Sequence, residues 1–437
     1  MERYAMKTLI QWKKSVNRKP MIIRGARQVG KTWLMKEYGK THFEDYAYFN
    51  FDENPRLGDI FNGDLNVERI ILALSAESGK SIKPESTLLI FDEIQEVPRA
   101  LTSLKYFNEN APEYVIVAAG SLLGVAMHQG TSFPVGKVNF MDLYPLNFRE
   151  FLSALGEERY ADILLEADND LVHTFRDKYI ERMKQYYYVG GMPEVVQSFV
   201  VDKDYIEVRR IQKELLDYYQ QDFSKHAPTS LVPRLNMVWQ SIPMQLAKEN
   251  KKFIYGQLRE GARAKDFELA IQWLQDCGLI HKISRIKKAG IPIIAYMDMQ
   301  AFKIYLHDVG LLAAMSDLSS RTIVDGNRIF TEFKGALTEQ YVQQQLISDT
   351  ELNPYYYSAE NARCEIDFVV SDGDVLFPIE VKAEENLKSK SLSVFCEKYG
   401  IKKGIRISMS DYREQDWMVN VPLYQIVKLK QWMTTNE

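Results

Sequence analysis

A glycine-rich string near the start of the chain has the residue types and the spacing of a phosphate-binding loop. Residues 25–32 read GARQVGKT, which fits the Walker A pattern G-x-x-x-x-G-K-[ST]. In such a loop backbone N–H groups curl around the β-phosphate, Lys31 would reach the β- and γ-phosphates, and the Thr32 hydroxyl would coordinate Mg²⁺. A glycine-rich turn without a ligand is the alternative. We expect a nucleoside triphosphate to bind Gly25, Ala26, Arg27, Gln28, Val29, Gly30, Lys31, Thr32 and Trp33.

Two acids further along would complete a hydrolytic site. The apolar run 87–91 ends in Asp92 and Glu93, as expected for a buried Walker B strand. Asp92 would hold Mg²⁺ through water, and Glu93 would orient and deprotonate the attacking water. Ser121 follows another apolar run and would sense the γ-phosphate, although capping of a following helix is an alternative role. Lys31, Glu93 and Ser121 are therefore the predicted catalytic residues for hydrolysis.

Acids and a lysine near the C-terminus form a second candidate site. Glu365 and Asp367 share one face of a predicted strand, and Glu380 and Lys382 share one face of the next. Asp367 and Glu380 could converge on Mg²⁺, and the lysine could help to generate a hydroxide that attacks a phosphodiester. An ordinary Glu-x-Lys ion pair on a strand face is the alternative.

The first third of the chain alternates between predicted strands and helices. Between Lys19 and Phe151, β-rich runs at 20–25, 46–52, 87–93 and 114–121 are separated by stretches long enough for crossover helices. This alternation predicts the α/β class, with a doubly wound parallel sheet that has helices on both faces.

The middle of the chain, from Tyr160 to Met315, is predicted to be mainly helical. Asp266 would cap a helix that ends at Gly278, and the β-rich runs 279–286 and 291–297 would form a hairpin. Helix followed by hairpin is the layout of a winged helix, which binds either nucleic acid or protein. The residues that would suit phosphate contacts are Lys282, Arg285, Lys287 and Lys288.

The last part of the chain again mixes helices and strands. We expect a helix at 336–347, then strands at 355–358, 365–371 and 375–383. Another helix and two strands, at 404–409 and 422–429, would follow.

Composition narrows the class of protein. Of 437 residues, 46% are apolar, which excludes a disordered polymer, and the net charge of −4 argues against coating nucleic acid by bulk charge. The three cysteines lie far apart, as suits a reducing compartment. The first residues lack the apolar segment of a signal peptide, and no apolar run reaches the about 18 residues that span a bilayer. We expect a cytoplasmic protein without a membrane partner.

The ordered set of motifs resembles the bacterial and archaeal AAA-type ATPases that carry a C-terminal domain of unknown function, DUF4143. GARQVGKT alone is shared by many unrelated proteins. The resemblance covers nearly the whole chain, because YFNFDE, LLIFDEIQ, LYPLNFREFL, YYYVGGMPEVV, KIYLHDVGLL, EIDFVV and PIEVK follow in order.

This resemblance implies ATP as the nucleotide and three domains. They are an AAA-like P-loop ATPase domain at 1–155, a helical and winged-helix region at 156–318, and a domain at 319–437 similar to the PD-(D/E)xK nucleases. Glu339 on the preceding helix would complete the nuclease-like site with Asp367, Glu380 and Lys382.

Two functions remain open at this point. One is an ATPase that acts on DNA through the winged helix and the C-terminal domain. The other is a nucleotide-dependent switch whose inactive C-terminal domain binds a protein partner. AAA-type relatives often complete the ATP site with an arginine of a neighbouring subunit, which would predict a homo-oligomer; Arg99 and Arg149 are the candidates.

Overall fold

A computed structural model of the protein describes residues 1–124, 133–321, 331–359, 364–383 and 389–435. The chain divides into two compact units. The N-terminal unit holds residues 2–144 and 272–279, and the C-terminal unit holds residues 145–271 and 280–437 together with Met1. The division into domains at 1–155, 156–318 and 319–437 stays a prediction.

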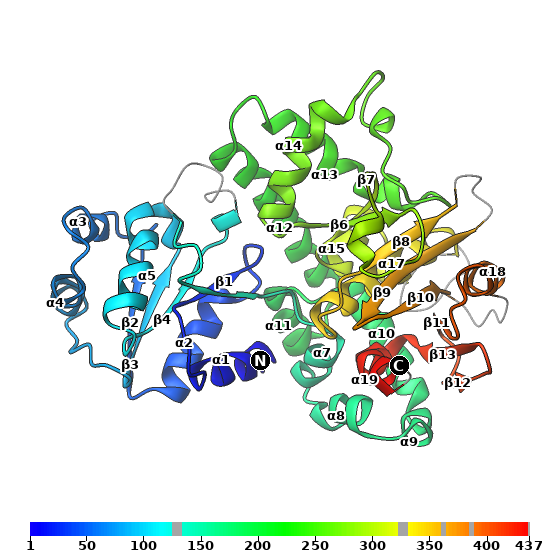
Figure 1. Ribbon diagram of the computed structural model, residues 1–437, viewed down its shortest axis with the longest axis horizontal. Coiled ribbons are helices and arrows are strands. Elements are labelled where there is room, and N and C mark those ends of the chain that lie inside the picture. The colour runs from blue at the N-terminus through cyan, green and yellow to red at the C-terminus, as the bar shows by residue number, and fades with distance from the viewer. Residues whose placement is uncertain (125–132, 322–330, 360–363, 384–388, 436–437) are drawn as a thin grey trace. The chain divides into compact units, whose positions relative to one another are not determined.

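An all-parallel sheet forms the centre of the N-terminal unit (Figure 1). The strands β3 and β4 are buried along their whole length, which explains their nearly continuous apolar sequences. β5 was not predicted, because it is a short edge strand in which buried and exposed residues mix. The strand order is β2 (Asp45–Asn50), β3 (Thr87–Asp92), β4 (Val115–Ala119), β1 (Met21–Arg24) and β5 (Asn139–Asp142).

Helices pack on this sheet as the α/β class requires. Three of them, α3 (Leu57–Phe61), α4 (Val67–Ser78) and α5 (Pro98–Asn110), join sheet residues in one apolar cluster. α2 (Lys31–His42) packs against β2, β3 and β4, and α1 (Ala5–Lys13) packs against α2. The predicted parallel sheet with its crossover helices is confirmed.

The C-terminal unit begins with helices, as predicted for the middle of the chain. They are α7 (Phe148–Ala154), α8 (Glu158–Glu166), α9 (Asn169–Thr174), α10 (Arg176–Val189), α11 (Pro193–Asp202), α12 (Tyr205–His226), α13 (Val232–Leu246) and α14 (Ala264–Asp276), the last of which continues into residues of the N-terminal unit. Asp266 lies in the first turn of α14 and not before it, so the predicted cap is misplaced.

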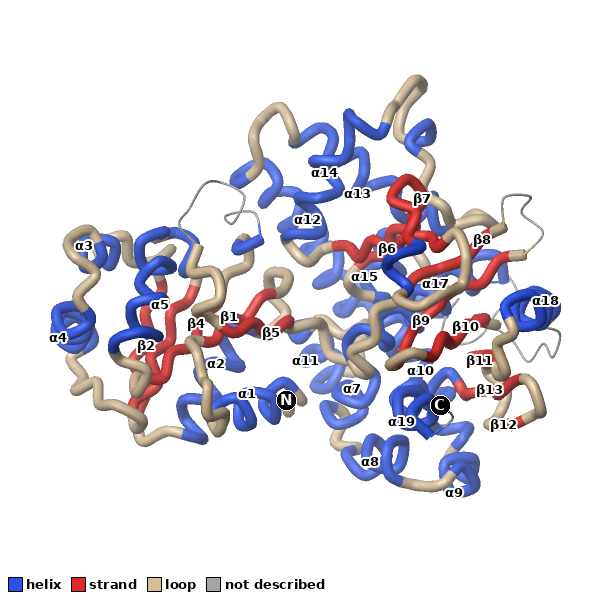
Figure 2. Tube along the Cα trace, viewed as in Figure 1, coloured by secondary structure: helices blue, strands red, loops and turns tan. Residues whose placement is uncertain are grey.

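A mixed sheet follows, with its strands drawn in red in Figure 2. It packs with α15 (Val309–Met315), α17 (Thr331–Ser348), α18 (Lys390–Tyr399) and α19 (Leu429–Thr435). Its strand order is β12 (Arg413–Glu414), β13 (Met418–Pro422), β11 (Gly404–Ser408), β10 (Val375–Val381), β9 (Glu365–Asp372), β8 (Tyr355–Ser358), β6 (Ile280–Ile286) and β7 (Met297–Leu306).

The predicted hairpin exists, but its second strand was placed wrongly. β6 pairs antiparallel with β7, which begins only at Met297, while 293–296 form a 3₁₀ helix. Pro292 has no N–H to give to a ladder, which disfavours a strand at its position. β6 also pairs in parallel with β8, which makes the hairpin an edge of the C-terminal sheet. The winged helix stays a prediction.

The strand predicted at 422–429 was also wrong. Residues 423–428 form a 3₁₀ helix, and the strand of this region is β13, which ends at Pro422. Residues 423–427 are all buried, and a continuous apolar run does not distinguish a buried strand from a buried helical turn.

Two sequence motifs of the C-terminal unit meet in its core. The Gly191 N–H donates to Asp308 Oδ2 at 2.6 Å, and the Leu311 N–H donates to Asp308 Oδ1 at 2.9 Å. Burial raises the pKa of the Asp308 carboxyl to about 6, although these N–H donors oppose the shift. Asp308 thereby joins the turn between α10 and α11 to the start of α15, which gives the motifs VGG and HDVG a structural role.

Candidate functional site

The loop between β1 and α2 has a backbone that only glycine allows at its two ends. Gly25 has φ 143°, and a Cβ there would lie 2.2 Å from Leu143 O. Gly30 has φ 95° and precedes the first residue of α2. N–H groups of a loop that leads into a helix are suited to phosphate oxygens. Residues 25–30 thus form a loop between β1 and α2, and Trp33 is exposed; nucleotide binding by residues 25–33 stays a prediction.

A buried arginine anchors this loop from the N-terminal segment. Arg3 Nη1 donates to Val29 O at 2.8 Å, and Arg3 Nη2 donates to Tyr144 O at 2.6 Å. Sequence reasoning missed Arg3, because a single arginine far from the motif carries no local signal.

Lys31 is held by the loop itself. Its Nζ donates to Gly25 O and to Ala26 O, each at 2.8 Å. Burial lowers the pKa of Lys31 to about 8, even though Glu93 and Asp92 oppose the shift. A triphosphate that bound here would have to draw the ammonium group from the loop carbonyls toward its own oxygens.

The pKa of Lys31 predicts that nucleotide affinity depends on pH. Phosphate oxygens favour the charged amine, so binding raises this pKa, and above pH of about 8 the protein must take up a proton to bind. The dissociation constant should be flat near pH 7 and rise by up to about tenfold per pH unit above pH 8. Titration of ATP at pH 7, 8 and 9 would show this. Lys31→Arg should flatten the profile, and an unchanged slope in that variant would contradict the assignment.

Thr32 and Asp92 come together across the sheet. Thr32 Oγ1 donates to Asp92 Oδ2 at 2.6 Å, and the Tyr48 hydroxyl donates to the same oxygen at 3.0 Å. Burial raises the pKa of Asp92, which these two donors partly offset. The pair fits Mg²⁺, because a hydroxyl and a carboxylate are the oxygen ligands that this ion takes beside phosphate. Tyr48 was not predicted from the sequence.

Glu93 lies between two neighbouring strand ends. Its carboxylate accepts from Ser121 Oγ at 3.1 Å and from Gln95 Nε2 at 2.7 Å. Burial opposes ionisation, but the donors and the charge of Lys31 outweigh it and lower the pKa of Glu93. Arg27 Nε donates to Ser121 Oγ at 3.0 Å, so Arg27 joins the same network. The roles predicted for these residues in hydrolysis stay predictions.

A strained backbone accompanies this carboxylate. Glu93 has φ 49° and ψ 44°, a left-handed conformation that costs a residue with a side chain about 1 to 2 kcal/mol. Glu93 directly follows β3, where a regular residue would continue the strand. Strain of this kind is typical of positions that function constrains.

The two candidate arginines are both engaged within the chain. Arg99 donates to Phe61 O and Gly63 O, each at 2.6 Å. Arg149 forms an ion pair with Asp349 at 3.4 Å inside the C-terminal unit. Neither contact is with a group of the loop at 25–33.

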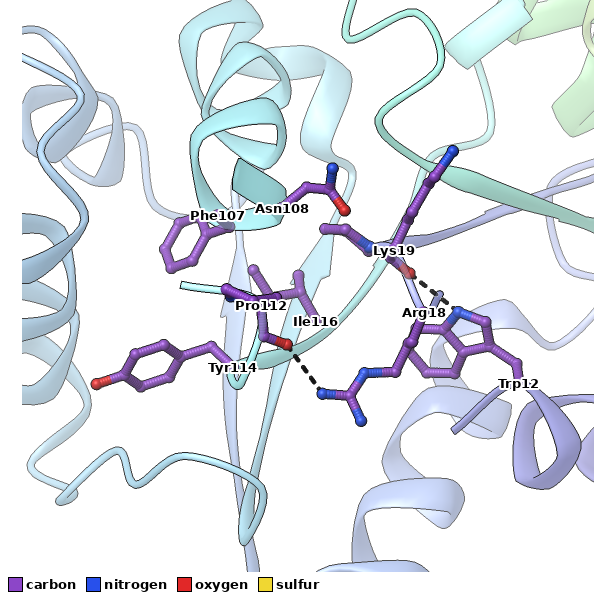
Figure 3. A pocket seen from close by; sticks show the side chains of 9 residues that line it. Trp12, Arg18, Lys19, Phe107, Asn108, Pro112, Tyr114 and Ile116 are labelled. Atoms are coloured by element: carbon purple, nitrogen blue, oxygen red, sulfur yellow. Dashed lines mark hydrogen bonds between the residues drawn. The ribbon is translucent and has the colours of Figure 1, made fainter. Parts of the chain in front are cut away.

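A small cavity lies at the amino ends of β1 and β4, where Figure 3 shows Trp12 and Arg18 beside each other. It measures about 10 Å³, room for about one water molecule. Arg18 donates to Pro112 O at 3.0 Å, and Trp12 Nε1 donates to Lys19 O at 2.9 Å. These residues are at the opposite ends of the strands from Lys31 and Glu93, so the cavity is not part of the nucleotide site.

In the C-terminal unit, Glu339 lies among cations that sequence reasoning missed. Lys251 Nζ donates to Glu339 Oε1 at 2.6 Å, and the Tyr305 hydroxyl donates to Oε2 at 3.1 Å. Lys303 Nζ, almost fully buried, lies 3.8 Å from Glu339 Oε2 and 2.9 Å from Glu365 Oε1. The carboxylates are thus neutralised by the chain's own lysines.

The other predicted residues of this cluster are also placed. Asp367 Oδ2 accepts from the Val381 N–H at 2.7 Å, and burial together with the Glu339 charge raises the pKa of Asp367 to about 7. Glu380 Oε1 lies 2.8 Å from Lys382 Nζ, so the ion pair considered as the alternative is formed. Across the described ranges no three acids, histidines or cysteines gather closely enough to hold a metal ion. A metal at Asp367 and Glu380 stays a prediction.

Family profiles match three segments of the chain. One described as AAA domain matches residues 17–152, a domain of unknown function (DUF8612) matches 180–322, and a domain of unknown function (DUF4143) matches 334–426. The chain therefore carries an AAA domain and a C-terminal DUF4143 domain, which confirms the resemblance at that level. The nuclease-like character of the DUF4143 domain stays a prediction.

An uncharacterized protein of Methanocaldococcus jannaschii is 28% identical over 220 residues, which span 49% of this chain and 44% of that protein. The matched region is thus less than half of the relative's length. Among the described residues, no helix is long and apolar enough to cross a membrane.

Three solved structures match the chain at low similarity. The Aeropyrum pernix Orc1 protein in complex with DNA is 13% identical with a TM-score of 0.26, over 74% of this chain and 92% of that one. Cdc6p from Pyrobaculum aerophilum is 13% identical with a TM-score of 0.25, over 73% and 94%. AMPPCP-bound DnaA from Aquifex aeolicus is 13% identical with a TM-score of 0.28, over 63% and 88%.

Proposed function

We propose that this chain, which carries an AAA domain and a C-terminal DUF4143 domain, is a Mg²⁺-dependent ATPase that acts on nucleic acid. The observation that supports hydrolysis most directly is the meeting of Thr32 with Asp92 at the end of β3, directly before Glu93. In this proposal the loop N–H groups and Lys31 bind the triphosphate, and Mg²⁺ when bound neutralises phosphate charge.

Glu93 would act as the general base. Its pKa is lowered, so the carboxylate is ionised at neutral pH and can accept a proton from water. Ser121 and Gln95 donate hydrogen bonds to the same carboxylate, and they would have to release one of its oxygens toward the water when ATP binds. Action on DNA is supported by the exposed Lys287 and Lys288 at the hairpin connection.

Phosphate release with and without DNA tests the proposal. DNA should raise the turnover of the wild type, and Lys31→Ala should abolish turnover in both conditions. Lys40→Ala removes an exposed lysine from the same helix and should behave as the wild type. ATP turnover that is the same with and without DNA, or that is unchanged in Lys31→Ala, would refute the proposal.

A specific observation favours a second function, a nucleotide-dependent switch with an inactive C-terminal platform for a protein partner. Lys251 and Lys303 already neutralise Glu339, and Lys303 also pairs with Glu365. A divalent cation would have to displace these ammonium groups to bind there. The carboxylates of this cluster therefore need no metal ion to offset their charge.

A metal-dependent nicking assay separates the two functions. Wild type, Asp367→Ala and Lys382→Ala would be incubated with supercoiled DNA and Mg²⁺ or Mn²⁺. If the wild type cleaves DNA and both variants do not, the second function, a switch whose C-terminal platform is inactive, is excluded. Equal nicking by all three proteins, or none, would favour the platform.

We also propose a homo-oligomer, which light scattering with and without ATP would detect. A cytoplasmic location is proposed because all three cysteines are buried and unbridged.

A further inference from the structure

A strand–helix–strand unit of the C-terminal sheet places three polar side chains in a row across neighbouring strands. β10 and β11 are parallel neighbours joined through α18, and Glu380 is paired in register with Arg406. Arg406 is paired in turn with Asn420 on β13. Side chains of paired residues on neighbouring strands point to the same face, so these three share one face.

The helix α18 covers that face and begins near this row of side chains. A Cβ on Gly404 would lie 2.8 Å from Leu392 Cγ, and Gly404 is on the Arg406 face by the period of two. Because a crossover helix runs opposite to its strands, Ser389, directly before α18, lies toward Arg406. Cys364 Sγ donates to Ser391 O at 3.4 Å and connects the first turn of the helix to the start of β9.

Arg406 is buried and rigidly oriented although no motif singles it out. Its exposed fraction is 2%, and its Nε donates to Asn420 Oδ1 at 2.8 Å. Asn420 is itself fixed, because Ser408 Oγ donates to it at 2.7 Å and its Nδ2 donates to Asp411 O at 2.8 Å. Burying an arginine costs free energy unless its donors are hydrogen-bonded.

Three buried polar atoms of this region lack a hydrogen-bond partner among the residues that the structure describes. They are Arg406 Nη1, Glu380 Oε2 and Ser389 Oγ, on side chains that are 2%, 6% and 7% exposed. The Ser389 side chain, at the N-cap position of α18, makes no capping hydrogen bond to the helix. Buried polar groups are normally satisfied, so an absent group would have to bond to these atoms.

The charges indicate what that group is. Lys382 Nζ lies 2.8 Å from Glu380 Oε1 and offsets its charge, and the Arg406 guanidinium and the N-terminus of α18 are two further positive groups, so an anion is favoured. The anion must also donate a hydrogen bond, because Glu380 Oε2 can only accept. A phosphate monoester can do both, since its second pKa is about 6 and a hydrogen bond to the carboxylate favours the form that keeps one proton, whereas an internal phosphodiester has none to donate.

We propose that Arg406, Ser389 and Glu380 form a binding site for a phosphate monoester, such as the phosphorylated end of a nucleic acid strand. The choice of nucleic acid as the source rests on the proposed function, but the phosphate site itself does not.

Binding measurements on the full chain test the site, with ADP and Mg²⁺ saturating the nucleotide loop so that phosphate cannot bind there. The ligands are inorganic phosphate and one single-stranded oligonucleotide with either a 5′-phosphate or a 5′-hydroxyl. The phosphorylated strand should bind at least about tenfold more tightly, the worth of one charge-assisted hydrogen bond. Inorganic phosphate should compete with it.

Arg406→Gln should remove this tenfold preference, and Ser389→Ala should weaken it by about threefold. Arg413→Gln is the matched control, because Arg413 is an exposed arginine paired with Asn420 on the edge strand. Equal affinity for both oligonucleotides, or a preference that survives Arg406→Gln, would overturn the site. If Arg406→Gln does not fold, an unchanged preference in Ser389→Ala overturns it.

The outcomes separate this site from the proposed function. Phosphate binding that depends on Arg406 without oligonucleotide binding would keep the site and refute nucleic acid as its source. DNA-stimulated ATP turnover without phosphate binding would keep the proposed function and overturn the site.

Discussion

Glu93→Gln should bind ATP about as well as the wild type and lose at least about 100-fold in turnover, because a general base contributes two to four orders of magnitude. The amide keeps the size of the carboxylate and can still accept from Ser121, so the loop and the Thr32–Asp92 pair stay in place. Steady-state phosphate release and ATP titration would give the two quantities.

Glu96→Gln is the matched control for this prediction. Glu96 is exposed and lies in the 3₁₀ turn that follows Glu93. Removing its charge should leave turnover within about twofold, since surface charges in high dielectric interact weakly. A Glu93→Gln variant that keeps more than about a third of the wild-type rate would show that another group is the base.

Gly190→Ala should lower the free energy of unfolding by at least about 3 kcal/mol, because it combines backbone strain with a clash in the core. Gly190 has φ 75° and ψ −163°, and a Cβ there would lie 2.1 Å from Asp308 Oδ1. The Asp308 side chain cannot move away without losing the Gly191 and Leu311 donors. Urea unfolding, monitored by tryptophan fluorescence, would measure the decrease in the free energy of unfolding.

Gly156→Ala isolates the backbone part of this effect. Gly156 also has a positive φ, 77°, but a Cβ there would meet nothing within 4 Å. It should cost about 1 to 2 kcal/mol. If both variants are destabilised equally, the close contact between Gly190 and Asp308 adds nothing to the backbone strain, which would contradict this prediction.

The placement of the candidate nucleotide-site residues could be predicted from the sequence because their signals are local. The loop at 25–32 and the acids at 92 and 93 each stand at the end of a strand whose apolar run is readable, and the sheet then brings them together. Tyr48 and Arg3 were not predicted, because their contacts depend on how the strands and the N-terminal segment pack.

The carboxylate cluster shows the limit of such reasoning. Glu339, Asp367 and Glu380 were predicted from the sequence. Lys251 and Lys303 were not, because they lie in earlier segments of the chain and belong to no motif. Those two lysines change the chemistry from an open acidic site to a neutralised one. The second strand of the hairpin was misplaced for a different reason, since β-branched and apolar residues at 291–297 indicated a strand where the structure has a 3₁₀ helix at 293–296.

Calorimetric titration of ATP with and without Mg²⁺, on the wild type and on Thr32→Val, tests the central claim most directly. Valine keeps the shape of threonine and removes only the hydroxyl that bonds to Asp92. One ATP should bind per chain, at least about tenfold more tightly with Mg²⁺, and Thr32→Val should lose that increment. No binding by the wild type, or a Mg²⁺ increment that Thr32→Val leaves unchanged, would contradict the account.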